Sequence, residues 1–295
     1  MGASDGTIIG TTKIVDNGPA SKRWNLVIMS EGYRLSEMGQ FAVDAQQIAN
    51  ALFVTPPFTQ LTSAMNIYRV DVASTDSGAD DPIACGGTGA APDTFFDASF
   101  CANGIPRLLV VDNITALKVA NAQVPEHHMV MVVVNSSQYG GSGGSVAVIS
   151  KAPSATEIAL HEMGHTAFGL ADEYESYRGC GSGETGQDTF SGAEPFEPNI
   201  TIDTNRATNK WRHLISAATP MATTRNANCA QCDPQPSPVP AGVVGTFEGA
   251  GYFHCNIFRP EYDCRMRALG FPFCAVCQER ILKTLSPFNP TPPAE

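Results

Sequence analysis

The chain has 295 residues, of which 43% are hydrophobic and 16% charged, and its formal net charge is −11. This length supports a full hydrophobic core in one large domain or in two modest lobes. No basic cluster offsets the negative charge, so nucleic acid and anionic membranes are not expected as partners. Its longest apolar runs, such as residues 129–134, are far too short to span a bilayer.

The first half of the chain alternates predicted strands with predicted helices. The strands have continuous apolar or β-branched runs and cover residues 23–30, 66–72, 108–111, 129–134 and 146–149. The helices carry apolar residues at helical spacing and cover residues 36–53 and 115–122. Strands that alternate with helices indicate an α/β fold with a mostly parallel, twisted sheet.

The last of these strands is short and follows the glycine-rich loop 140–144. Both features are typical of a strand at the edge of a sheet. An edge strand can bind an extended peptide by adding it as a further strand. We therefore expect Val146, Ala147 and Val148 to form a substrate-binding edge.

A predicted helix follows, with Ser154 as its N-cap and Glu157 three residues later, which is the pattern of a capping box. His161 and His165 lie four residues apart on it, so both imidazoles leave the same face and provide two ligands of a zinc site. Between them, Glu162 is placed to take a proton from a water molecule that the metal activates. The motif predicts hydrolysis of peptide bonds by metal-activated water.

The residues after the helix supply candidates for a third ligand. Gly169 offers a stop for the helix and a reversal of the chain, which brings back Asp172 or Glu173. Either carboxylate suits zinc, and the spacing from the glycine favours Asp172.

The second half of the chain is rich in loops and cysteines. Residues 176–250 are rich in Gly, Pro, Asn and Thr, and residues 274–285 resemble a C-terminal helix. Six of the nine cysteines lie between residues 229 and 277. Disulfides of an exported protein are the favoured interpretation. The alternative is a second, structural zinc site at the C-x-x-C pairs 229/232 and 274/277. An acidic loop with Asp76, Asp80 and Asp81 is a further, weaker candidate, for calcium.

Three segments together resemble the bacterial IgA-type zinc metallopeptidase family, which is related to the metzincins. They are the H-E-M-G-H-x-x-F-G-L-A-D-E-Y stretch that begins at His161, the V-I-M-S-E-G-Y stretch at 27–33, and the R-P-E-Y-D-C-R-M-R stretch at 259–267. The metzincin motif is H-E-x-x-H-x-x-G-x-x-H/D; here the glycine and the acid each come one residue later, at Gly169 and Asp172.

The resemblance implies a role for each matching position. His161, His165 and Asp172 would bind the zinc ion, with Glu173 as the alternative third ligand, and Glu162 would be the general base. Met266 would form the Met-turn below the metal. Tyr252 and Tyr262 lie near the motifs and are candidates for supporting the oxyanion.

The resemblance also implies a metzincin-like peptidase fold. Residues 1–170 would form an N-terminal α/β lobe that ends in the zinc-binding helix, and residues 171–295 a loop-rich lobe, together making one catalytic unit. We expect a secreted zinc endopeptidase acting on protein substrates, immunoglobulin-type ones among them. No signal peptide is visible at the N-terminus. The alternative is a non-catalytic binding or adhesion module that zinc stabilises.

Overall fold

The computed structural model describes residues 2–176, 188–232 and 235–290. They divide into two compact units: Met1–Ala167 with Thr284–Glu295, and Phe168–Lys283. The division into functional lobes at residue 170 stays a prediction. Among the described residues, no helix combines the length and the apolar character needed to cross a bilayer.

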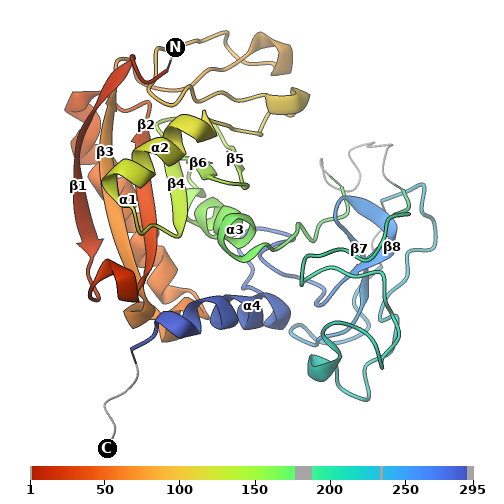
Figure 1. Cartoon of the computed structure of the whole chain (residues 1–295). Coiled ribbons are helices and arrows are strands. Elements are labelled where there is room, and N and C mark those ends of the chain that lie inside the picture. Colours follow the sequence, from red (N-terminus) through yellow and green to blue (C-terminus); the bar gives the residue numbers. More distant parts are fainter. Residues whose placement is uncertain (1, 177–187, 233–234, 291–295) are drawn as a thin grey trace, which may run out of the picture. The chain divides into compact units, whose positions relative to one another are not determined.

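A six-stranded mixed sheet forms the centre of the first unit (Figure 1). Its strands are, in spatial order, β1 (Gly6–Val15), β3 (Met65–Ser74), β2 (Trp24–Glu31), β4 (Met129–Val134), β6 (Ala147–Ser150) and β5 (Gly141–Ser142). The four inner strands run parallel to one another, whereas the edge strands β1 and β5 pair in antiparallel fashion. Every residue of β2 and β4 is buried, which explains the unbroken apolar sequence of β4 and the apolar run 26–29 within β2.

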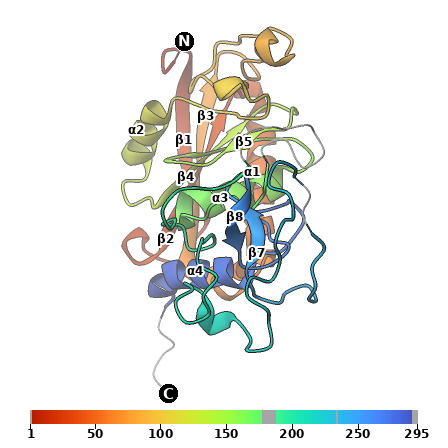
Figure 2. The same cartoon turned by 90° about the vertical axis from the view of Figure 1, so that its right-hand side faces the viewer.

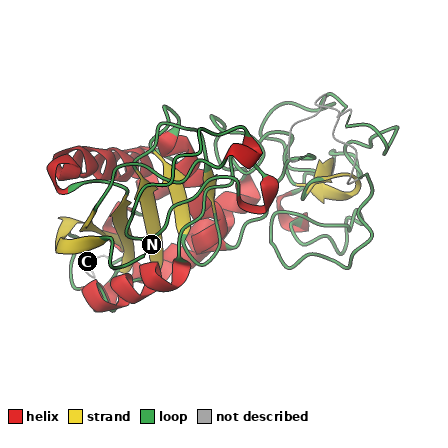
Figure 3. Cartoon of the chain, turned by 90° about the horizontal axis from the view of Figure 1, so that it is seen from above, coloured by secondary structure: helices red, strands yellow, loops and turns green. Residues whose placement is uncertain are grey.

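Helices cover both faces of this sheet (Figure 3). α1 (Met38–Val54) and α2 (Asn113–Gln123) lie on opposite faces (Figures 1 and 2). The small residues Ala116 and Ala120 of α2 pack in one apolar cluster with valines of β2 and β4. Asp112 caps α2, because its side chain accepts hydrogen bonds from the backbone N–H groups of Ile114 and Thr115.

The sequence predictions hold for the inner strands and fail at the edges. β2, β3, β4 and β6 lie where buried strands were predicted, and α1 and α2 where helices were. The strand predicted at 108–111 is wrong: Leu108 and Val110 form only isolated bridges, while Leu109 and Val111 face the core. β1 and β5 were missed; both pair in antiparallel fashion, so the sheet is mixed, while its four inner strands are parallel as predicted.

The expected edge position of β6 is also wrong. Its Val148 and Ile149 pair with Ser142 and Gly141 of β5, so β6 is flanked on both sides. The glycine-rich loop folds back beside the strand instead of leaving it open. A substrate-binding role for Val146, Ala147 and Val148 therefore loses the free edge on which it was based.

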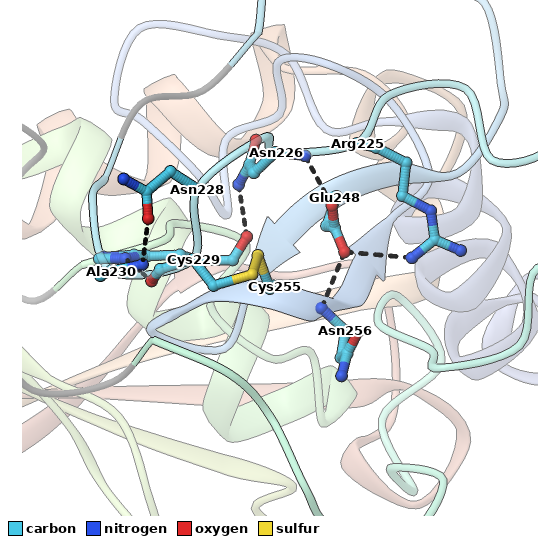
Figure 4. Close-up of a disulfide and its surroundings, with 9 residues drawn as sticks. Arg225, Asn226, Asn228, Cys229, Ala230, Glu248, Cys255 and Asn256 are labelled. Atoms are coloured by element: carbon cyan, nitrogen blue, oxygen red, sulfur yellow. Dashed lines mark hydrogen bonds and ion pairs between the residues drawn. A yellow bond between two sulfur atoms is a disulfide. The ribbon is translucent and has the colours of Figure 1, made fainter.

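The second unit has little regular structure. A hairpin of β7 (Phe247–Ala250) and β8 (Phe253–Arg259) was missed from sequence, whereas α4 (Ala275–Leu285) lies where the C-terminal helix was predicted (Figure 2). A disulfide joins Cys229 to Cys255 of β8 (Figure 4). Beside it, the buried carboxylate of Glu248 accepts hydrogen bonds from the backbone N–H groups of Asn226 and Asn256. The disulfide and the Glu248 carboxylate together connect the loop before β7 to the β7–β8 hairpin.

Candidate active site

The histidine pair lies on α3 (Ala155–Phe168), which begins directly after the predicted cap Ser154. The Nε2 atoms of His161 and His165 are 3.2 Å apart, and their ring planes are nearly perpendicular. Two zinc–nitrogen bonds of about 2.0–2.1 Å at the tetrahedral angle separate their nitrogens by roughly 3.3–3.4 Å. The two imidazoles of this helix therefore fit a shared metal ion without rearrangement.

Glu162 and His165 both lie against the glycine-rich loop of the first unit. Glu162 is buried, at 8% exposure. A Cβ atom on Gly141 would come within 3.0 Å of the Glu162 carboxylate, and one on Gly143 within 2.5 Å of the Cβ of His165. Glycine is required at both positions because the loop backbone passes directly over the helix. The loop thereby fixes the side chains of the motif and screens one side of them from solvent.

The helix ends as predicted at Gly169. This glycine has a φ of 62°, the left-handed conformation that closes many helices. The last helical carbonyl, that of Phe168, accepts a hydrogen bond from Nε of Arg280 at 2.9 Å. A cation at the C-terminus of a helix is also favoured by the helix dipole. The left-handed Gly169 and the hydrogen bond from Arg280 together fix the point from which the chain continues to Asp172.

Asp172 lies in the second unit, where the β7–β8 hairpin holds both its backbone and its side chain. Its carbonyl accepts a hydrogen bond from the N–H of Gly251 at 3.0 Å, and its Oδ2 accepts one from the hydroxyl of Tyr252. Burial and the charge of Asp172 both raise the pKa of Tyr252, so the phenol stays protonated and donates. Sequence reasoning offered Tyr252 as an oxyanion residue and missed this contact.

The neighbouring carboxylate, Glu173, has different surroundings within the same unit. Its side chain is fully buried and lies with the thiols of Cys264, Cys274 and Cys277, all of which are free. Burial, followed by the effect of Cys264, raises the pKa of this carboxyl group. Asp172 and Glu173 are adjacent in sequence, but their carboxylates lie in two distinct polar clusters.

Met266 and Tyr262 are also placed in the second unit. Met266 is fully buried, and its carbonyl accepts a hydrogen bond from the N–H of Glu173 at 2.8 Å. It lies in a tight turn, because the N–H of Arg267 bonds to the carbonyl of Cys264. The Tyr262 ring is covered by the guanidinium of Arg267, at 5.0 Å. The Met-turn role of Met266 and the oxyanion role of Tyr262 remain predictions.

The cysteines follow neither sequence interpretation completely. Cys85 pairs with Cys101 and Cys229 with Cys255, and Cys232 is also disulfide-bonded, so a zinc site at the 229/232 pair is wrong. The 274/277 pair, by contrast, is reduced. Cys180 lies outside the described residues. In the acidic loop, Asp81 accepts a hydrogen bond from the N–H of Thr88, and Asp76 pairs with Arg34.

The comparison with known protein families agrees with the assignment of the histidine motif on α3 to an active site. The family model described as IgA Peptidase M64 matches residues 12–232 and 236–285, which is nearly the whole chain. The chain belongs to the IgA peptidase M64 family. No curated protein matches it by sequence.

Membership of the M64 family implies a peptidase, a hydrolase that acts on proteins or peptides, and points to the metal-dependent type. The matched range includes all of α3, the hairpin that holds Asp172 and all of α4. The family resemblance inferred from the three sequence segments is therefore confirmed.

Proposed function

We propose that this chain is a secreted, zinc-dependent endopeptidase of metzincin-like architecture. The observation that carries the proposal is the separation of 3.2 Å between the two Nε2 atoms on α3, with the buried Glu162 between them in sequence. His161, His165 and Asp172 would hold the ion. A third ligand is needed because a catalytic zinc site uses three protein ligands and leaves one position open. The disulfides agree with export, since such bonds persist in oxidising compartments.

Asp172 is favoured over Glu173 as the third ligand for two reasons. Asp172 has the better spacing from Gly169, and the carboxylate of Glu173 is already engaged with Asn199 and the thiols. The hydrogen bond from Tyr252 is the kind of support that ligating carboxylates receive in metal sites.

Zinc would supply Lewis-acid polarisation of the scissile carbonyl and would lower the pKa of a water molecule. Glu162 then accepts a proton from the attacking water as the new carbon–oxygen bond forms. The same carboxyl group passes that proton to the amine nitrogen as the carbon–nitrogen bond breaks. Burial of Glu162 beside Gly141 keeps the carboxylate in one position for both transfers. We propose proteins as substrates, immunoglobulins among them.

The variant Glu162→Ala tests this assignment. Cleavage of casein or immunoglobulin should fall by about 10²–10⁴-fold, the usual contribution of a general base, while zinc binding persists. Glu157→Gln, in the first turn of the same helix, is the matched control and should keep both properties. Undiminished cleavage by Glu162→Ala would contradict the role of this residue.

Removal of the metal separates a peptidase from the alternative of a binding module. Cleavage should stop with a chelator and return when zinc is added. If no protein substrate is cut with zinc present, the binding module becomes the better description.

A further inference from the structure

Four buried side chains of the second unit form a cluster that the peptidase chemistry does not use. Glu173, Cys264, Cys274 and Cys277 are each at most 2% exposed. Their potential ligand atoms all lie within 4.8 Å of one another. We propose that these four residues bind a structural Zn²⁺ ion, separate from the metal of the active site.

The distances in the cluster match those of a tetrahedral zinc site. Cys264 Sγ and Cys277 Sγ are 3.8 Å apart, and two zinc–sulfur bonds of about 2.3 Å at the tetrahedral angle require roughly 3.8 Å. The Oε1 atom of Glu173 lies 3.5 Å from Cys277 Sγ and 3.8 Å from Cys274 Sγ. With a zinc–oxygen bond of about 2.0–2.2 Å, the expected separation is roughly 3.5–3.7 Å.

The backbone around the cluster favours thiolates. Cys264 Sγ accepts hydrogen bonds from the N–H groups of Met266 and Cys274, and Cys274 Sγ accepts one from Cys277. Cys274 directly precedes α4, and Cys277 lies in its first turn. The positive end of a helix dipole lowers the cost of a negative sulfur atom. Two of the three sulfur atoms, those of Cys264 and Cys274, thus accept backbone hydrogen bonds before any ion is considered.

Glu173 supplies an independent observation. Its Oε2 atom is buried and finds no hydrogen-bond partner among the described residues, while Oε1 accepts a hydrogen bond from Asn199 at 2.8 Å. A buried carboxylate oxygen without a partner is costly. A cation bound at Oε1 neutralises the buried carboxylate and so lowers the cost of leaving Oε2 without a partner, and the bond from Asn199 to Oε1 orients the ligand as neighbouring groups do in metal sites.

The donor set identifies the ion and the role of the site. Three sulfur atoms with one carboxylate in tetrahedral geometry suit zinc, and a site closed by four protein ligands is structural. The ligands come from the segment after α3, from the Met266 turn and from the start of α4. The ion would therefore tie together three segments of the second unit. One of them carries Asp172, directly before Glu173.

The decisive experiment uses a chain that has lost the histidine pair. In the double variant His161→Ala/His165→Ala, elemental analysis should still find a single zinc ion per chain. X-ray absorption should show three sulfur ligands at about 2.3 Å and one lighter ligand. Absence of zinc, or zinc without sulfur ligands, would overturn the proposal. This result is independent of the peptidase assignment, which the activity of the Glu162 variant tests.

Two further variants test the site without removing any of its three cysteines. Glu173→Cys, made in the same double variant, should retain the ion and raise the sulfur count to four. Cys85→Ser/Cys101→Ser is the control, since it removes a disulfide of the first unit and should leave the zinc signal unchanged. Cobalt substitution should give thiolate charge-transfer absorption in the control, and its absence there would count against the site.

Discussion

At the scale of single residues, the turn between β7 and β8 shows how Asp172 is held. Gly251 and Tyr252 have φ angles of 57° and 73°, and two-residue hairpin turns with positive φ at both positions usually use asparagine and glycine. A tyrosine in this conformation costs about 1–3 kcal/mol. Three contacts offset that cost: the two turn N–H groups bond to the carbonyls of Asp172 and Tyr174, and the phenol bonds to the Asp172 carboxylate.

The variant Tyr252→Phe removes the phenol hydroxyl and keeps the ring. Zinc affinity at the peptidase site should fall by about 10–100-fold, the usual effect of losing a group that supports a ligand. Competition with a chromogenic chelator measures it, and circular dichroism reports whether the fold is kept. Tyr68→Phe, in β3, is the control and should match the unchanged chain. An unchanged affinity in Tyr252→Phe would show that the hydroxyl does not support a ligand.

At the scale of elements, the pairing of α3 with the glycine-rich loop is the sharpest steric constraint on the motif. Gly143→Ala would place a methyl group 2.5 Å from the Cβ of His165. Either the glycine-rich loop or α3 must therefore shift. A displacement near 1 Å at a catalytic group costs about 10²-fold in rate. We expect kcat/KM to fall by that order.

Gly39→Ala provides the glycine control for this prediction. It lies in α1, where an added Cβ meets nothing within 4 Å, so activity should be kept and the helix slightly stabilised. Equal activity of the Gly143 variant and this control would show that the loop tolerates displacement.

Local patterns explain which elements could be predicted. β4 is a continuous apolar run because both of its faces are buried, and the histidine pair follows from helix geometry alone. The run at 108–111 has the same composition, but its backbone bonds to isolated partners. β8 escaped detection because Asn256, with a φ of 65°, interrupts its alternation, and β7 is only four residues long.

The cysteine cluster could not be derived from sequence for a different reason. Its C-x-x-C pair is visible, but Cys264, 13 residues before Cys277, and Glu173, 104 residues before it, are brought to the pair by tertiary folding. The nearby pair 229/232 has the same spacing and forms disulfides. Spacing alone therefore cannot separate a metal site from a disulfide. The distinction requires the positions of the partner side chains.

At the scale of the whole molecule, the two units are stabilised by different means. The first has an extended apolar cluster across the sheet and α2, whereas an apolar cluster of the second consists of Ile200, Ala250 and Ile257 with three partly buried neighbours. The described part of the second unit has few strands and helices to hold its loops, so cross-links between those loops matter more for it. The Cys229–Cys255 disulfide and the proposed zinc site are such cross-links in residues 168–283.

Removal of the proposed structural zinc ion by a chelator should therefore increase hydrogen exchange in the second unit and leave exchange in the first unit unchanged. An ion that binds the folded state at 1,000 times its dissociation constant contributes about 4 kcal/mol of stability. In the His161→Ala/His165→Ala variant, a strong chelator should accelerate hydrogen exchange in the peptides covering 168–176 and 264–285, whereas β2 and β4 keep their protection. Mass spectrometry of exchanged peptides measures both regions in one sample. Added zinc should restore the slow exchange, and equal exchange with and without chelator would show that the second unit does not depend on a metal.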